Sequence, residues 1–585
     1  MRRALVVLLA FWAAAAPAQD VSIRGSRKAT ATWETHVGDP DRRPMTPADV
    51  FALQDVEEIR ISPDAATVVF SVTRTDLQAN RTTTRVMRVA ARGGMPTELE
   101  AIPDGADVLR WAPDSHRLAF FASSNGRRAL WTYELDPGRL TRVCDCDRSN
   151  VFPPNSGNWL SWSPDGSRLA FAGTLDAART PDDRRTHIYV VPAGGGKPTA
   201  LTTGDYDDHS IDWGSDGSEI VFLSNRGKDS TIPRNGDIFA VAVGTGRVRR
   251  LTDTPGGEAE PRISPDGQWI AYVAEDGHIF AMPIGGASAK VNSGGPRELN
   301  HALDRRSSAP EWAPDGRTIL YTAFDRGKTV LYRVSLQGSA SVALIDRKAQ
   351  VGPFSMARDG LIAVGLSDPL TPREVYRFRP DGDLQPLTSL NSAVIGQWQL
   401  VAPEPFPFKS AGGTDVVAWY YPPVASARPA ARSIPLILSI HGGQRGGHPY
   451  RFNAGLQVQA ARGYATLVVY PRRGSGDGDS EDVLACVDQF LRMKPEIDVD
   501  RIGIIGSREN GIMDELVRRP DRFRAAVSMS SVSNPPPLTH ASDTRIPTLF
   551  LHEPEDPVHD FDRMERSLAW FDRYLKTAAA RPSRQ

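Results

Sequence analysis

The chain has 585 residues, of which 40% are hydrophobic and 24% are charged. This length exceeds one ordinary core, so two large domains are expected, and the composition argues against long disordered regions. The formal net charge is −1, which argues against the polybasic surface typical of nucleic-acid binding.

The N-terminus has the pattern of a secretion signal. Arg2 and Arg3 precede an apolar run over residues 4–16, and Ala16-Pro17-Ala18 forms a small-residue cleavage site. The run is too short to span a membrane comfortably, and no other stretch of the sequence is long and apolar enough. We therefore expect residues 1–18 to be removed on export to a periplasm or beyond, which leaves no membrane span.

A short phrase recurs at even spacing through the first part of the chain. Most copies read Trp or Ile, a small residue, Pro, Asp and Gly, and an alternating apolar strand follows. The seven copies are Ile61–Asp64, Trp111–Asp114, Trp162–Gly166, Trp213–Gly217, Ile263–Gly267, Trp312–Gly316 and Met356–Gly360, with aspartates 44 to 51 residues apart. Pro, Asp and Gly favour a tight turn between two strands. Because this period is typical of propeller blades, the sequence predicts seven blades.

After about residue 400 the pattern changes to strands that alternate with helices. Strands are expected over residues 435–440, 465–470, 501–505, 524–529 and 547–552, and helices over residues 456–462 and 481–493. This alternation predicts a parallel sheet covered on both faces, with active groups at the carboxyl ends of its strands. His441–Gly443, Gly506–Arg508 and Asp556 would lie along that edge.

Segments of both parts together resemble the prolyl oligopeptidase family of serine peptidases, especially its acylaminoacyl-peptidase and dipeptidyl-peptidase branch. They are the propeller phrases, His441–Gly443, Tyr470–Ser475, Asp500–Gly503, Asp521–Val527 and Trp570–Leu575. The resemblance implies a seven-bladed β-propeller over residues 19–400 and a truncated C-terminal α/β-hydrolase domain over residues 401–585. It implies hydrolysis of short peptides, and we expect no cofactor and no metal.

The position of the family's nucleophile is altered. A nucleophile elbow reads G-x-S-x-G, whereas this chain reads Gly506-Ser507-Arg508-Glu509-Asn510. Arg508 occupies the nucleophile position, and its guanidinium cannot attack a carbonyl. Ser507 lies one residue early, and it is either a helix N-cap or the nucleophile of a slipped elbow. Gly443 and Glu509 occupy the positions whose amides would form an oxyanion hole.

The acid and histidine positions are unusually close together. Asp556 fits the family's acid position, and His559 follows only three residues later. In this fold a helix and a strand normally separate the two. Asp556 is therefore either the carboxylate that orients His559, one helical turn away, or a solvated loop residue. His559 is either a working base or a surface histidine.

The leading interpretation is an exported family member that keeps its two-domain shell but has little or no peptidase activity. It would bind short peptides or a protein partner between the domains, with Arg508 at a helix start meeting a peptide carboxylate. One alternative is an active hydrolase that uses Ser507, Asp556 and His559. The other is an interaction protein in which the propeller alone matters, as in the propeller proteins of the bacterial Tol system.

The three cysteines are too few for disulfides to hold an exported fold together. Cys144 and Cys146 are expected in a surface turn, either free or paired with each other. Cys486 lies in an apolar helical pattern, and it is expected to fill a small space in the core.

Overall fold

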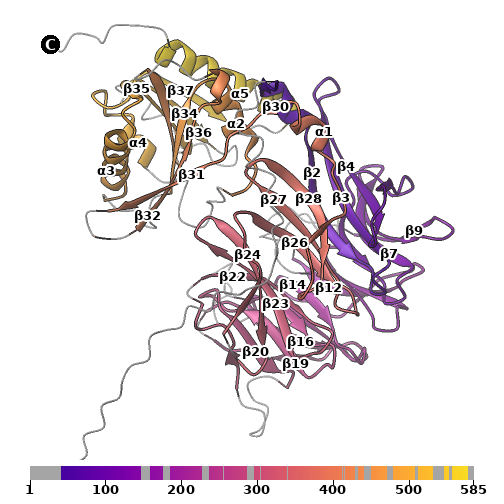
Figure 1. Ribbon diagram of the computed structural model, residues 1–585. Helices are drawn as coiled ribbons and strands as arrows, with labels where there is room; N and C mark the ends of the chain where they lie inside the picture. The colour runs from indigo at the N-terminus through magenta and orange to yellow at the C-terminus, as the bar shows by residue number, and fades with distance from the viewer. Residues whose placement is uncertain are drawn as a thin grey trace, which may run out of the picture.

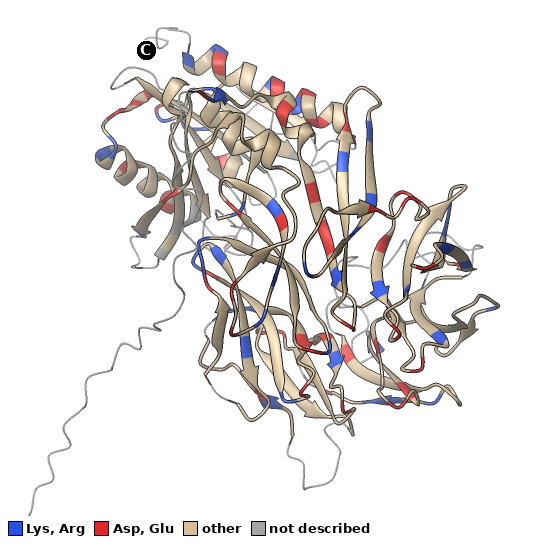
Figure 2. Cartoon of the chain, turned by 45° about the vertical axis from the view of Figure 1, so that its right-hand side comes forward, with Lys and Arg blue, Asp and Glu red and all other residues tan. Residues whose placement is uncertain are grey.

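The computed structural model describes residues 41–576 apart from several gaps. The gaps are residues 147–157, 176–184, 227–235, 286–294, 428–432, 441–449, 471–477, 508–511, 531–545 and 553–555, and the single residues 255, 304, 339, 411, 412 and 414. Figure 1 shows a β-propeller followed by an α/β domain that lies above it. Acidic and basic residues are interspersed along the chain in both domains (Figure 2).

Seven blades of four antiparallel strands form the propeller, as predicted. The first three contain β2 (Gln54–Ile61), β3 (Thr67–Asp76), β4 (Arg81–Ala90) and β5 (Thr97–Glu98); β6 (Asp107–Trp111), β7 (Arg117–Ser124), β8 (Arg127–Glu134) and β9 (Arg139–Asp145); and β10 (Leu160–Trp162), β11 (Arg168–Gly173), β12 (His187–Pro192) and β13 (Thr199–Ala200). The next two contain β14 (Asp208–Trp213), β15 (Glu219–Ser224), β16 (Asp237–Ala242) and β17 (Val248–Arg250); and β18 (Ala259–Ile263), β19 (Trp269–Val273), β20 (Ile279–Pro283) and β21 (Arg297–Glu298). The last two contain β22 (Ser307–Trp312), β23 (Thr318–Asp325), β24 (Lys328–Ser335) and β25 (Val342–Ile345); and β26 (Gln350–Met356), β27 (Ile362–Asp368), β28 (Thr371–Phe378) and β29 (Gln385–Pro386).

The recurring phrase forms the turn between the first and second strands of each blade. In blade 3 the Asp165 carboxylate accepts the amide N–H of Ser167 at 3.0 Å, and Gly166 has the left-handed φ of 67° that the turn requires. The tryptophan just before the turn connects neighbouring blades. Trp162 Nε1 donates to the carbonyl of Arg110 at 3.1 Å, and Trp111 Nε1 donates to that of Arg60 at 3.0 Å. The phrase therefore turns the chain in each blade, and it also joins neighbouring blades where it begins with Trp111, Trp162 or Trp312.

A second repeat follows the outermost strands, and the sequence analysis missed it. A leucine packs into the core, and the side chain of the next residue accepts an amide N–H from the neighbouring strand. The accepting residues are Thr202 (2.9 Å), Thr252 (2.8 Å), Asn300 (2.7 Å) and Thr388 (2.8 Å). Each satisfies a backbone donor that the short outer strand leaves unpaired.

The propeller ring closes through contacts between blades 7 and 1. The amide N–H of Ile61 donates to Ser355 Oγ at 2.7 Å, and Arg373 Nη1 donates to the carbonyl of Val56 at 2.7 Å. All four strands of each blade come from one continuous segment. The amide N–H of Arg358 also donates to the carbonyl of Pro63 at 3.0 Å. Closure therefore depends on these contacts between the two blades rather than on a shared strand.

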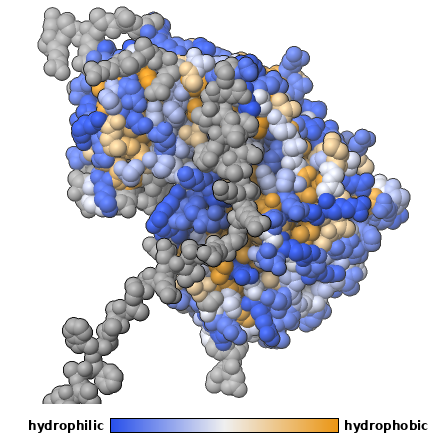
Figure 3. Space-filling model, in the orientation of Figure 1, coloured by the Kyte–Doolittle hydropathy of each residue, from blue (hydrophilic) through white to orange (hydrophobic). Residues whose placement is uncertain are grey.

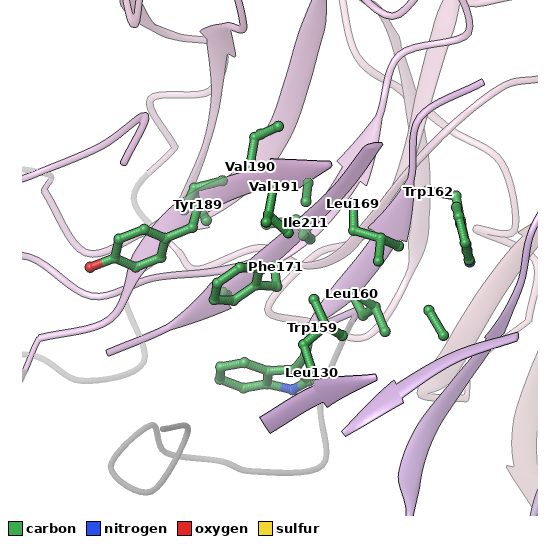
Figure 4. Packing of buried hydrophobic residues seen from close by; sticks show 14 of the residues in the cluster. Leu130, Trp159, Leu160, Trp162, Leu169, Phe171, Tyr189, Val190, Val191 and Ile211 are labelled. Atoms are coloured by element: carbon green, nitrogen blue, oxygen red, sulfur yellow. The ribbon is translucent and has the colours of Figure 1, made fainter. Parts of the chain in front are cut away.

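Interleaved apolar side chains fill the spaces between blades. Figure 4 shows this for blades 2 to 4, where Leu130, Phe171, Tyr189 and Ile211 pack together. Cys144 and Cys146 belong to the same cluster and are both buried and free. The expectation of a surface turn was wrong, because β9 carries Cys144 into the interface between blades. A hydrogen bond with Cys144, together with burial, raises the pKa of the Cys146 thiol.

The α/β domain is built on one seven-stranded sheet, ordered β31-β32-β34-β33-β35-β36-β37. Its strands are β31 (Glu404–Lys409), β32 (Asp415–Tyr421), β33 (Ile434–Ile440), β34 (Ala465–Tyr470), β35 (Ile497–Ser507), β36 (Ala525–Ser530) and β37 (Thr548–His552). The five strands from β34 to β37 in this order are parallel, and β31 and β32 add an antiparallel edge. All five parallel strands that the sequence predicted are present.

Helices cover both faces of this sheet. The helices are α2 (Ala454–Ala461), α3 (Gly478–Met493), α4 (Ile512–Leu516) and α5 (Pro557–Phe571), which continues into the π-helix Asp572–Lys576. Leu436 and Leu438 of β33 pack in the cluster of α3 and α4, whereas Ile437 packs on the opposite face with Phe571. Cys486 of α3 is fully buried, as expected. No helix in the described part of the chain is long and apolar enough to cross a membrane.

Two short segments join the domains on one side. The 3₁₀ helix Pro47–Ala52 precedes the propeller, and α1 (Ser392–Ile395) follows it, whereas the 3₁₀ helix Ala425–Ala427 lies within the α/β domain between β32 and β33. Strands β1 (Arg43–Pro44) and β30 (Trp398–Gln399) pair in parallel. Leu370, at the tip of the β27–β28 hairpin, packs with Phe452 and Leu568 of the α/β domain. This contact fixes the hydrolase domain against blade 7.

Candidate active site

The predicted nucleophile segment begins at the end of the central strand β35. This strand pairs with β33 on one side and β36 on the other, so that Gly506 lies opposite Ile440 and Ser507 lies opposite Met529. A β-carbon at Gly506 would approach the carbonyl of Ile440 to 3.0 Å and the Met513 sulfur to 3.1 Å. Only glycine therefore fits comfortably between β33 and the helix that follows, as an elbow requires.

Several predicted site residues cannot be placed. Gly443, Arg508 and Glu509 lie outside the described residues, and only the backbone of Ser507 is described. Their roles remain predictions from the sequence. Adjacent strands lie about 4.8 Å apart, so the backbone of Ser507, on β35, lies two strand spacings from His552 at the end of β37.

Asp556 and His559 are brought into direct contact. Asp556 is the N-cap of α5, and its Oδ1 accepts the amide N–H of His559 at 3.0 Å. Its Oδ2 lies 2.8 Å from His559 Nδ1. The hydrogen bond from the His559 amide, followed by that from the imidazole, lowers the pKa of Asp556 below its ordinary value. The predicted contact one turn apart is therefore present.

The setting of this pair differs from that of a buried acid–histidine couple. The His559 side chain is 72% exposed, and that of Asp556 is 32% exposed. The carboxylate accepts a hydrogen bond from Nδ1. The neutral imidazole then has its free lone pair on Nε2, as a general base requires. However, the same carboxylate also caps the helix, and both residues are held on one turn at the surface.

Asn80 is a third member of this cluster, and sequence reasoning did not find it. It lies at the tip of the β3–β4 hairpin of blade 1, with a left-handed φ of 46°. Its Oδ1 accepts the amide N–H of Val558 at 3.0 Å, and its side chain also hydrogen-bonds to Asp556. Phe51 and Phe561 pack edge to face beside it, with ring centroids 6.1 Å apart. The propeller therefore helps to fix the start of α5.

Asn80 could not be inferred because 476 positions separate it from Asp556 in the chain. Within the described residues, no group of three or more His, Cys, Asp or Glu side chains is arranged to hold a metal ion. The chemistry available at this edge is thus that of a carboxylate, an imidazole and backbone amides.

Comparison with known families identifies the propeller. Residues 108–355 match the family described as the TolB β-propeller domain. The Tol-Pal system protein TolB of Bordetella pertussis is 31% identical over 41% of this chain and 60% of its own length.

Other relatives cover nearly the whole chain. Dipeptidyl-peptidase 5 of Porphyromonas gingivalis is 24% identical over 88% of this chain and 82% of its own length. An uncharacterized peptidase of Bacillus subtilis, YuxL, is 22% identical over 84% and 82% of the two chains. These relatives extend the match from the propeller into the α/β domain.

Solved structures share the two-domain architecture. The acylaminoacyl peptidase of Pyrococcus horikoshii matches with a TM-score of 0.73 and 18% identity, covering 92% of this chain and 98% of that one. A puromycin-hydrolyzing peptidase of Mycobacterium tuberculosis matches with a TM-score of 0.65 and 16% identity, covering 92% and 97%. The chain is thus a homologue of peptidases of the prolyl oligopeptidase, acylaminoacyl peptidase and dipeptidyl-peptidase type, and it has their fold.

Proposed function

We propose that this chain is an exported homologue of these peptidases that has little or no peptidase activity and binds peptides between its two domains. The observation that carries the proposal is the placement of Asp556 and His559 on the first, exposed turn of α5. A histidine on the same turn as its acid has little freedom to reach a nucleophile two strands away. Arg508, in the nucleophile position of the sequence, supplies no attacking oxygen.

Hydrolysis assays test the loss of activity. Aminoacyl and dipeptidyl p-nitroanilides would be assayed with the wild-type chain and with Ser507→Ala. We expect both proteins to release p-nitroaniline at the same background rate. A wild-type rate well above that of Ser507→Ala would contradict the proposal, because removal of a working nucleophile typically lowers turnover by about 10⁴-fold or more.

An active hydrolase that uses Ser507 is the second candidate. One observation favours it, because the Asp556–His559 contact of 2.8 Å leaves the imidazole in the tautomer that a general base needs. In that case both Ser507→Ala and His559→Ala would abolish hydrolysis, whereas a nearby surface change such as Asp562→Ala would leave it unchanged.

The binding role concerns Arg508. A guanidinium at a helix start favours an anion, and a peptide carboxylate is the anion that a peptidase homologue meets. We expect Arg508→Ala to weaken the binding of short peptides with a free carboxyl end, measured by calorimetry. Equal affinity of the two proteins would refute this role.

Two further parts of the proposal have their own tests. Export predicts that the secreted protein begins at Gln19, and N-terminal sequencing that finds Met1 would contradict it.

A role for the propeller alone is supported by the match of residues 108–355 to TolB propellers. Loss of partner binding by full-length variants altered only in the α/β domain would exclude that role.

A further inference from the structure

A groove lies at the opposite edge of the hydrolase sheet from β37. It has a volume of about 850 Å³, which is within the range of small-molecule sites. The described residues that line it include Arg326, Pro405, Pro407, Lys409, Trp419 and Tyr450. Most belong to β31 and β32, whereas Arg326 comes from the β23–β24 hairpin of blade 6. The groove therefore lies between the two domains. In Figure 1, β31 and β32 lie at the part of the α/β domain that faces β22 and β24.

The walls of the groove are aromatic and proline-rich. Trp419 and Tyr450 pack edge to face with ring centroids 4.7 Å apart. Pro405 and Pro407 lie on the edge strand β31 and have no amide N–H. An added β-strand would lack donors at these positions, so the edge is unsuited to strand pairing. A compact ligand with a ring or other apolar group fits these walls better.

The polar groups of the groove are mainly hydrogen-bond donors. Trp419 is only 4% exposed, and its indole Nε1 has no hydrogen-bond partner among the described residues. A buried N–H without an acceptor is uncommon in proteins, so a ligand oxygen that reached this N–H would gain a hydrogen bond. None of the described residues that line the groove is acidic, and Arg326 and Lys409 are cationic. The charge and the donors together favour an anion.

Arg326 is held at the groove by a strained turn. The β23–β24 hairpin closes with Asp325 paired to Lys328, and Arg326 and Gly327 have φ of 47° and 90°. Blade 2 has the same two-residue turn at Asn125-Gly126, with φ of 52° and 73°.

Asparagine tolerates this left-handed position readily, whereas arginine is strained there. Strain of this kind is typical of functional positions. The Arg326 side chain is exposed, and it makes no hydrogen bond or ion pair with another described residue. Its guanidinium is thus available to a ligand at the groove.

We propose that this groove binds the carboxyl-terminal aromatic residue of a short peptide, with Arg326 on the carboxylate and the ring between Trp419, Tyr450 and the prolines of β31. A guanidinium matches a carboxylate with two parallel hydrogen bonds. The Trp419 indole N–H donates to a carbonyl or carboxylate oxygen of the same residue. This site lies away from β37, and it does not depend on whether the active edge hydrolyses peptides.

Calorimetry with a matched pair of peptides tests the site. The probes are N-acetyl-alanyl-prolyl-phenylalanine with a free carboxylate and the same peptide as its carboxamide. We expect the acid to bind the full-length protein at least about tenfold more tightly than the amide, as for a charged hydrogen bond. Equal affinities, or no binding of the acid, would overturn the proposal.

Two variants locate the binding. Arg326→Gln should remove the preference for the acid peptide, whereas the hairpin-tip change Arg127→Gln in blade 2 should retain it.

Trp419→Phe removes the indole N–H but keeps an aromatic ring, and it should weaken the binding of the acid peptide about threefold to tenfold. Trp398→Phe is its control, because that buried indole also lacks a partner among the described residues but lies outside the groove. An acid preference that survives in Arg326→Gln would assign the binding elsewhere, including to Arg508.

Discussion

The propeller and the active edge of the hydrolase domain differ in redundancy. Equivalent residues in several blades make the same stabilising contacts, whereas each role at the active edge depends on one or a few residues. In the propeller the same turn recurs in all seven blades, and the tryptophan contact between blades recurs at Trp111, Trp162 and Trp312, so that single copies vary without loss of the blade. Trp213 has an indole N–H without a partner among the described residues, yet its blade keeps four strands. At the active edge a single residue, Asp556, both accepts an amide N–H at the start of α5 and contacts the His559 imidazole. A fold of this kind can therefore keep its shell while its chemistry is lost.

The largest expected effect is in the propeller core. Phe171 is fully buried, and it stacks on Tyr189 at 5.4 Å and packs edge to face on Phe121 at 6.4 Å. Phe171→Ala should lower the free energy of unfolding by about 3–5 kcal/mol, measured by denaturant titration of the propeller transition. Met95→Ala is the control, because Met95 is 88% exposed and should change stability by less than about 0.5 kcal/mol. A similarly small change in unfolding free energy for both variants would show that the propeller tolerates the removal of a buried side chain from its core.

The next effect depends on pH. Burial, opposed by hydrogen bonds from Thr254 and Thr252, raises the pKa of Glu258 to about 7. Between the ordinary value of 4.5 and about 7, the folded protein holds a proton that the unfolded chain has lost. Stability should therefore fall as pH rises through this window, by up to about 3 kcal/mol.

Glu258→Gln isolates that contribution, because glutamine cannot ionise. The difference in unfolding free energy between about pH 5 and about pH 8 should be smaller in the variant than in the wild type. Identical pH profiles would show that Glu258 is ionised in the folded propeller.

A smaller effect is expected in the hydrolase sheet. A β-carbon at Gly503 of β35 would lie 2.7 Å from Phe571 and 2.9 Å from Leu575, both of which are buried. Gly503→Ala should therefore lower stability by about 1–3 kcal/mol. At Gly244 a β-carbon would meet nothing within 4 Å, so Gly244→Ala serves as the control. Equal stabilities of the two variants would mean that α5 packs loosely on β35.

The smallest effect concerns the start of α5. Asp556→Ala removes an N-cap and should increase hydrogen exchange of the amides at residues 558–560. Asp560→Ala, on the same turn but not the cap, should leave exchange of these amides nearly unchanged. Because the pKa of Asp556 is lowered in the folded protein, its contribution is present above the ordinary aspartate pKa and is lost as pH falls through the folded value. Exchange that is independent of Asp556 would mean that Asn80 alone holds this turn.

Much of the architecture could be predicted because it rests on local patterns. The Pro-Asp-Gly turns at an even period specified the blades, and apolar runs such as residues 465–470 specified the parallel strands. The buried position of Cys144 and Cys146 could not be predicted, because C-D-C carries no periodic signal and burial depends on the neighbouring blade. The second repeat, a leucine followed by Thr or Asn, was missed because such a pair is common in any sequence.

The candidate site could be predicted only in part. The contact of Asp556 with His559 follows from a spacing of one helical turn, and it is present. The contribution of Asn80 depends on how the propeller docks, which no local pattern encodes. The same is true of Arg326, which lines the same groove as Trp419 although it comes from the other domain.

Reaction with a fluorophosphonate tests the proposed loss of the nucleophile most directly, because this reagent labels an activated serine covalently. The protein would be incubated with the reagent while folded, and its intact mass would then be measured. We predict an unchanged mass for the wild type and for Ser507→Ala alike. Addition of one reagent to the wild type, mapped to Ser507 and absent in His559→Ala, would contradict the account and establish a working hydrolase.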